Sequence, residues 1–268
     1  MKIVAIDLDG TLLHSDCTIS SYSKEVIAEA AKNDIMVVPT SGRSFRSIKN
    51  QVGDIEGIKD CISGNGNVVT DIRTEDIIHN NKLPQYFVYR IYKEVKKRGG
   101  FIELYCDNDA YVEKENKEIM YQTQMPVEFC DDLLSTDIVG LSFDLLLRRG
   151  IMKVNKIHVA FPDPMDVQEF AGELMRNEEL MVTFPSPYNM EIFSKGCNKD
   201  TGIRILSEKF HVAQKDTVAI GDVAMIQYAH MGVAVANAAQ VLKEKADYIT
   251  KSNDEDGPAI VLKKILKK

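Results

Sequence analysis

The sequence lacks several features that mark common classes of protein. Its five cysteines are scattered, without a Cys-x-x-Cys pair, and none lies in a recognisable Cys/His setting. The sequence therefore indicates no zinc site, redox centre or catalytic thiol. We expect free thiols at Cys17, Cys61, Cys106, Cys130 and Cys197.

Net positive charge and long apolar runs are also absent. The formal net charge is −7, so there is no overall basic field to attract nucleic acid. No apolar run approaches the roughly 18 residues of a membrane span, and the N-terminal MKIVAIDLDG becomes acidic too early for a signal peptide. We therefore expect a cytoplasmic protein without a nucleic-acid or membrane partner. No sequence feature indicates its oligomeric state.

What is present suits a packed α/β fold. The chain has 268 residues, of which 44% are hydrophobic and 27% charged, as in ordinary globular proteins. Residues 2–8 and 35–38 read as strands buried on both faces, and 23–33 as an amphipathic helix between them. A similar alternation returns at 200–235, and a helix is expected after Pro258. This pattern predicts a Rossmann-like core built on a parallel sheet.

The middle of the chain has a different pattern. A helix at 85–97, strands at 101–106, 111–113 and 155–161, and a helix at 165–177 are typical of an α+β domain. We therefore predict a core of residues 1–83 and 188–268, interrupted by an inserted α+β cap of residues 84–187. The boundaries are placed at Leu83-Pro84 and Pro187-Tyr188.

Two early carboxylates follow the first predicted strand. Asp7 and Asp9 lie at its carboxyl end, where ligands of open α/β sheets bind, and Gly10 allows a sharp turn. Carboxylates at this spacing could share a metal ion or a proton, with one acting as nucleophile and the other as general acid/base. The alternative is a plain polar turn that closes a strand.

Further polar residues are expected at the same edge of the sheet. Ser41 and Gly42 follow the second buried strand and could bind an anion at the start of a helix, or simply cap that helix. Lys199 precedes the predicted helix at 200–210 and could balance negative charge, with Lys195 as a competitor. Asp222 follows another buried strand and is a suitable magnesium ligand or an ordinary turn residue.

With these motifs, the chain resembles the haloacid dehalogenase superfamily, in particular the Cof-like sugar-phosphate phosphatases with a large inserted cap. The resemblance covers nearly the whole chain. It rests on the motifs Asp7-Leu-Asp9-Gly10-Thr11-Leu12, Thr40-Ser41-Gly42-Arg43, Asn65-Gly66, Glu191-Ile192, Lys195-Gly196-Cys197-Asn198-Lys199, Gly221-Asp222, and a tail from Asn237-Ala238 to Asp256-Gly257.

The resemblance implies a role for each residue. Asp7 would be the nucleophile, Asp9 the general acid/base, and Asp7, Asp9 and Asp222 the ligands of Mg²⁺. Ser41, Gly42 and Lys199 would bind phosphate. Lys199 is preferred over Lys195 because of its register in the motif. The remaining positions, Arg43, Asn65 and Gly66, would form a substrate loop, although Asn-Gly is also a common turn.

The fourth motif departs from the family pattern. The family has Gly-Asp, two variable residues and Asn-Asp, whereas Gly221-Asp222 runs directly into Val223-Ala224. About four residues are missing, close to one helical turn, so the following helix could keep its apolar face. One carboxylate and an asparagine are absent, and Asp222 could stand for either family aspartate.

Two functions follow from these expectations. The first is magnesium-dependent hydrolysis of a small phosphorylated metabolite (a sugar phosphate, nucleotide or cofactor phosphate) through an aspartyl-phosphate on Asp7, with the cap selecting the substrate. The second is a binding or regulatory protein that keeps the phosphate pocket but has lost efficient turnover through the shortened motif. A phosphotransferase or mutase is a third option.

Overall fold

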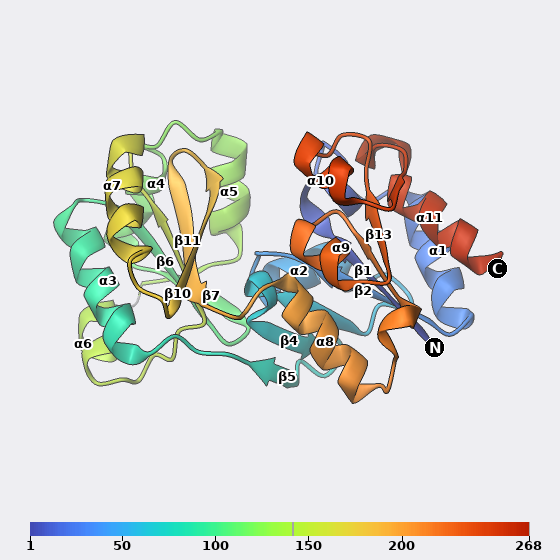
Figure 1. The fold of residues 1–268 in the computed structure, drawn as a ribbon. Helices are drawn as coiled ribbons and strands as arrows, with labels where there is room; N and C mark the ends of the chain where they lie inside the picture. Colours follow the sequence, from blue (N-terminus) through green and yellow to red (C-terminus); the bar gives the residue numbers. More distant parts are fainter. Residues whose placement is uncertain (141, 268) are drawn as a thin grey trace. The chain divides into compact units, whose positions relative to one another are not determined.

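The computed structural model describes residues 1–140 and 142–267, and these form two compact units. The first, called the core, comprises Met1–His79 and Asn198–Lys268. The second, called the cap, comprises Asn80–Cys197. Each is described separately, and the labels are those of Figure 1.

Within the described residues, the core contains one eight-stranded sheet in the order β14-β13-β12-β1-β2-β3-β4-β5. Neighbours from β14 to β3 are parallel, and β4 runs antiparallel to β3. The predicted parallel-sheet core is confirmed. The strands are β1 Lys2–Asp7, β2 Ile35–Thr40, β3 Asp60–Ser63, β4 Val68–Asp71, β5 Ile77–Asn80, β12 Thr217–Ile220, β13 Met231–Ala234 and β14 Tyr248–Ile249.

Helices cover both faces of the core sheet (Figure 1). One face packs on α1 Ser21–Lys32, α2 Phe45–Val52 and α11 Gly257–Leu266. The other packs on α8 Lys199–Lys209, α9 Val223–Tyr228 and α10 Gln240–Lys245. Because both faces are covered, the central strands read as continuous apolar runs, and residues 3–6 of β1 are fully buried.

Within residues 80–140 and 142–197, the cap has a six-stranded sheet in the order β10-β11-β9-β6-β7-β8, antiparallel except for the β7–β8 pair. One face packs on α3, α6 and α7, and the other on α4 and α5. The strands are β6 Phe101–Cys106, β7 Asp109–Val112, β8 Ile138–Val139, β9 Lys156–Ala160, β10 Leu180–Ser186 and β11 Asn189–Ser194; the helices are α3 Gln85–Lys97, α4 Lys117–Met120, α5 Val127–Ser135, α6 Phe143–Arg148 and α7 Pro164–Leu174.

The boundaries of the two units differ from the predicted ones. The first lies earlier, at His79/Asn80, because Leu83 belongs to the apolar core of the cap and its N–H donates to the carbonyl of Val154. The second lies later, at Cys197/Asn198, because β11 pairs with β9 and β10. The predicted break at Pro187-Tyr188 is the turn between β10 and β11.

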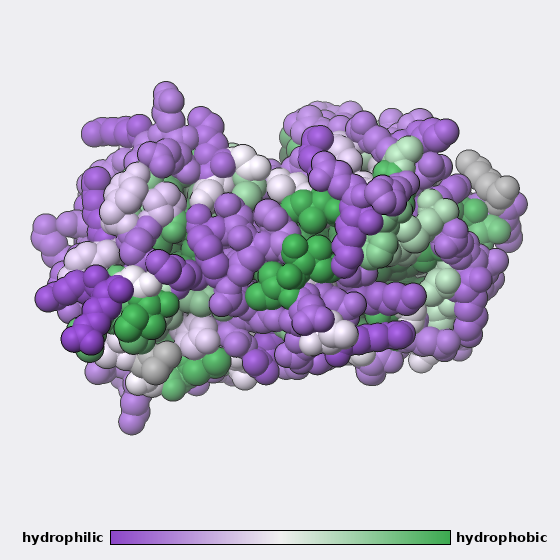
Figure 2. Space-filling view, turned by 90° about the horizontal axis from the view of Figure 1, so that it is seen from below, coloured by the Kyte–Doolittle hydropathy of each residue, from purple (hydrophilic) through white to green (hydrophobic). Residues whose placement is uncertain are grey.

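The surface is mostly polar on the face seen in Figure 2, where hydrophobic residues form small separate patches. None of the helices formed by residues 1–140 and 142–267 combines the length and apolar character needed to cross a bilayer. The cysteines described are unpaired, as expected.

Candidate active site

The structure brings three predicted residues of the core together at the carboxyl edge of the sheet. Asp7 ends β1, Asp222 follows β12 and Lys199 begins α8. The Lys199 ammonium lies 2.7 Å from Asp7 Oδ1 and 3.3 Å from Asp222 Oδ2. All three side chains are largely buried. Because the Lys199 ammonium contacts both carboxylates, its positive charge compensates the negative charge of Asp7 and Asp222 together.

Burial sets the protonation behaviour of this cluster. The pKa of Asp7 is raised to about 6, mainly by desolvation; Lys199 lowers it, and the charges of Asp222 and Asp9 make smaller upward contributions to this value. Burial opposes protonation of Lys199, but the ion pairs with Asp7 and Asp222 outweigh it and raise the pKa of Lys199. Asp7 is therefore a carboxylate near neutral pH, held beside a permanent cation.

Gly221 allows the loop that carries Asp222 to pack closely against Thr11 and Asp7. A Cβ at Gly221 would lie 2.4 Å from Thr11 Oγ1 and 3.0 Å from Asp7 Cβ, and its φ is +101°. Only glycine fits this close approach without strain. Asp222 also caps α9 by accepting from the Met225 N–H at 3.1 Å. Asp222 thus places one carboxylate beside Lys199, and the helix after it, α9, is short.

Asp9 has different partners. It lies in a tight turn, Leu8–Leu12, with its side chain 54% exposed. The Arg43 guanidinium donates to both carboxylate oxygens, through Nη2 at 2.7 Å and Nε at 3.1 Å. Ser41 Oγ lies 3.4 Å from Asp9 Oδ2 and accepts from the Arg43 N–H. Ser41, Arg43 and Asp9 therefore form a second polar group.

The helix expected after Gly42 is α2, and Ser44 rather than Ser41 is its N-cap. The cap interpretation of Ser41 is therefore wrong, which leaves its hydroxyl beside Asp9. Asn65 and Gly66 form a buried turn with positive φ. A Cβ at Gly66 would lie 1.9 Å from the carbonyl oxygen of Asn198, so this turn packs directly against the start of α8. The pair thereby helps to place Lys199.

The competing lysine is not part of this cluster. Lys195 is an exposed residue of the cap whose backbone N–H donates to Glu179. The predicted metal ligands are also not fully assembled: among residues 1–140 and 142–267, no group of three His, Cys, Asp or Glu side chains is arranged to hold a metal ion. Asp7 and Asp222 share Lys199, whereas Asp9 pairs with Arg43.

Sequence reasoning gave no role to the contacts that hold the Asp9 turn. Asn237 Nδ2 donates to the carbonyl of Gly10 at 2.8 Å, and Asn237 Oδ1 accepts from the Asn253 N–H. Asp256 accepts from Ser20 and Ser23 nearby. Asn237 and Asp256 both belong to the C-terminal motif on which the family resemblance partly rests. That motif was the sequence signal that could have indicated their role.

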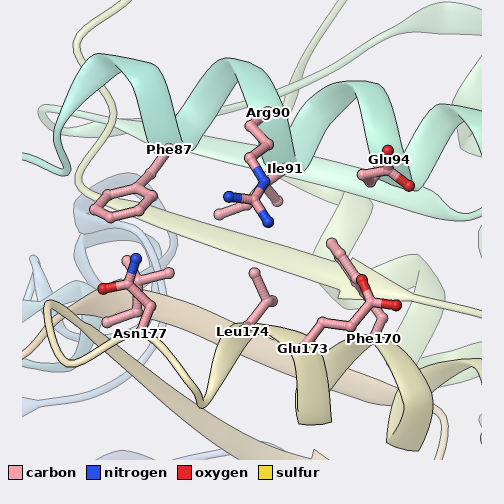
Figure 3. Close-up of a pocket in the computed structure, with 9 residues that line it drawn as sticks. Phe87, Arg90, Ile91, Glu94, Phe170, Glu173, Leu174 and Asn177 are labelled. Atoms are coloured by element: carbon pink, nitrogen blue, oxygen red, sulfur yellow. The ribbon is translucent and has the colours of Figure 1, made fainter.

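The cap contains a buried polar network that sequence reasoning also missed. Its strands β6, β9 and β11 place Glu103, His158 and Glu191 in register across one face. Elsewhere in the cap, α3 and α7 face each other across a small cavity of about 40 Å³, into whose opening Arg90 extends (Figure 3). That cavity contains none of the predicted site residues.

The sequence is similar to that of a known family of hydrolases. The sequence model of the family described as haloacid dehalogenase-like hydrolase matches residues 4–262. The chain is 27% identical to 5-amino-6-(5-phospho-D-ribitylamino)uracil phosphatase YcsE of Bacillus subtilis, covering 97% of this chain and 93% of the relative. It is 25% identical to phosphatase YwpJ of the same organism, covering 99% and 100%.

A solved structure shares the fold. A haloacid dehalogenase-like hydrolase from B. subtilis superposes with a TM-score of 0.85 at 23% identity, covering 98% of this chain and 99% of the other. Because the family model spans nearly the whole sequence, the chain belongs to the haloacid dehalogenase-like hydrolase family.

Proposed function

We propose that this hydrolase is a magnesium-dependent phosphatase that transfers the phosphoryl group of a small metabolite to Asp7 and then hydrolyses the aspartyl-phosphate. The observation that carries the proposal is the Lys199 ammonium, 2.7 Å from Asp7 and 3.3 Å from Asp222. A buried nucleophile beside a fixed cation suits attack on an anionic phosphate. The named phosphatases among the relatives support the same reaction class.

The chain's residues divide the work as follows. The Asp7 carboxylate attacks phosphorus in line with the leaving oxygen. Asp9, the more exposed carboxyl group, donates a proton to that oxygen and later takes one from water. Lys199 balances the charge on Asp7 and on the phosphate, and the Ser41 hydroxyl donates to a phosphate oxygen. The cap would supply the contacts that select the leaving group.

Mg²⁺ fits the donor chemistry of the site, since carboxylate oxygens are its preferred protein ligands. The mutual repulsion of Asp7, Asp9 and Asp222 contributes to the raised pKa of Asp7, and a cation would relieve it. These three residues would hold the ion, which would neutralise phosphate charge when bound.

The test is phosphate release from a panel of phosphorylated metabolites, including sugar phosphates, nucleotides and a ribitylaminouracil phosphate like the one in the YcsE name. We expect release that is lost with chelator and in Asp7→Asn. The exposed Asp54→Asn is the matched control and should keep full activity. Unchanged turnover in Asp7→Asn would remove Asp7 as nucleophile.

A second candidate function is favoured by one observation. Asp222 is the single carboxylate of the shortened fourth motif. It forms an ion pair with Lys199 and accepts a hydrogen bond from the Met225 N–H. A phosphometabolite-binding or regulatory protein with impaired turnover would bind members of the same panel saturably without releasing phosphate. Rapid hydrolysis would contradict it. A phosphotransferase would instead deliver the phosphoryl group to an acceptor other than water.

A further inference from the structure

A second cavity lies in the core at the edge of the sheet opposite Asp7 and Asp222. Its volume is about 550 Å³, within the range of roughly 300–1,000 Å³ typical of small-molecule sites. It opens where β1, β12, β13 and β14 begin, whereas Asp7 and Asp222 follow the ends of β1 and β12. None of the candidate active-site residues lines it, so its occupant would be separate from the substrate.

Apolar side chains from the sheet and from α11 form the walls. Val218 and Met231 come from β12 and β13, and Val261 and Ile265 come from α11. Tyr248, which is 37% exposed, also lines the cavity. An apolar ligand body would gain burial against these walls.

Lysines surround the apolar walls. Lys2, Lys215 and Lys264 line the cavity, and Lys264 Nζ lies 4.1 Å from the centre of the Tyr248 ring. Within residues 1–140 and 142–267, neither Lys2 nor Lys215 forms an ion pair with a carboxylate. Two aspartates also line the site, and one of them, Asp247, accepts from the Gly232 N–H at 2.8 Å.

We propose that this cavity binds a small organic monoanion with an apolar, fused-ring-sized body. The lysines outnumber the aspartates, so a single negative charge is favoured even though the whole chain is acidic. The two aspartates disfavour ligands that carry several negative charges. The volume of about 550 Å³ suits a small molecule, whereas a protein partner would need an area of about 800 Å² on this surface.

The probe for this site is 8-anilinonaphthalene-1-sulfonate, a fluorescent aromatic monoanion, titrated into the full chain. We expect saturable binding that the double variant Lys215→Glu/Lys264→Glu weakens at least about tenfold, because two attractive charges become repulsive. The matched control is Lys114→Glu/Lys153→Glu, which reverses two exposed lysines of the cap and should leave the affinity unchanged.

Two further measurements locate the probe and test its charge. The methyl resonance of Met231 should shift during the titration, and the shift should saturate with the fluorescence. Naphthalene-1-sulfonate should displace the probe more effectively than naphthalene-1,5-disulfonate. The proposal is overturned if the Lys215→Glu/Lys264→Glu variant binds like the parent, if the cap control weakens binding equally, if Met231 does not respond, or if the disulfonate competes better.

Discussion

The core and the cap each bury acidic side chains, and one carboxyl cluster in each compensates the charge in an opposite way. In the core, Asp7 and Asp222 share the Lys199 ammonium, and Asp9 pairs with Arg43. In the cap, Glu103 and Asp137 lie close together and are compensated mainly by protonation. Desolvation raises the pKa of Glu103 to about 7, although Lys156 lowers it, and desolvation together with the charge of Glu103 raises the pKa of Asp137 to about 9.

Hydrogen bonds around His158 organise the cap network. Asn189 Nδ2 donates to His158 Nε2 at 3.2 Å, so the ring proton is on Nδ1 and is donated to Glu103 Oε2 at 2.9 Å. Burial lowers the pKa of His158 to about 4, which keeps the ring neutral. Beside this network, Lys156 pairs with Glu191 at 2.5 Å and lies over the ring of Tyr105.

We expect this difference to separate a reactive cluster in the core from a structural one in the cap. The cations of the core can exchange a carboxylate for an incoming phosphate without any change in protonation. We therefore expect the core cluster to govern turnover and the cap cluster to govern stability and its dependence on pH.

The largest expected effect is that of Lys199→Met. Without the ammonium, phosphate and Asp7 repel each other and the pKa of Asp7 rises further, so kcat/KM for phosphate release should fall at least about a hundredfold. Lys195→Met, at the neighbouring exposed lysine, is the control and should have little effect. Comparable activity in the two variants would contradict the role of Lys199.

The corresponding substitution in the cap is Lys156→Met. The Lys156 side chain is 1% exposed and its removal leaves Glu191 buried without its cation. We expect the free energy of unfolding to fall by about 3 kcal/mol, measured by urea denaturation. Lys153→Met, at an exposed lysine, should change it by less than about 0.5 kcal/mol. An equal loss in both variants would mean that the buried ion pair is not responsible.

Asp137→Asn tests the dependence of stability on pH. The folded protein holds a proton on Asp137 up to a pH of about 9, whereas the unfolded chain releases it near the ordinary value of 3.8. Stability should therefore fall as pH rises through this window, by up to about 1.4 kcal/mol per pH unit for one proton. The variant cannot take up this proton, so the slope should flatten.

Urea denaturation at several pH values between about 5 and 9 measures that slope. Glu118→Gln, which removes an exposed carboxyl group of α4, serves as the control and should retain the steeper slope. A slope that is identical in the parent and in Asp137→Asn would show that this carboxyl group is already ionised at neutral pH.

Much of the fold could be predicted from local sequence patterns. Buried strands such as β1 and β12 are continuous apolar runs, and α3 shows clear helical periodicity, so their positions were predicted closely. Strands β10 and β11 were missed because Pro185 and Pro187 lie at the end of β10 and in the turn after it, and because the pairing of β11 with β9 depends on contacts distant in sequence. The second boundary was misplaced for the same reason.

The core site was partly predictable because strand ends bring distant residues to one edge. Asp7, Lys199 and Asp222 followed from that rule and from their motifs. The pairing of Asp9 with Arg43 depends on side-chain direction, which the sequence pattern does not contain. The cap network escaped prediction because Glu103, His158 and Asp137 have no motif. Glu103 and His158 meet only through strand register, and Asp137 comes from the loop just before β8.

The smallest expected effect isolates one charge within the core cluster. The charge of Asp222 raises the pKa of Asp7, so Asp222→Asn should lower that pKa below its value of about 6. A raised carboxyl pKa means that stability is fully present below the ordinary value of 3.8 and declines as pH rises toward about 6. In Asp222→Asn this decline should be smaller, because the folded protein then releases the proton at a lower pH. Carbon-13 NMR of the Asp7 carboxyl group in metal-free protein measures the change directly, and an upward shift would mean that the loss of Asp222 weakens the Lys199 contact more than it relieves repulsion.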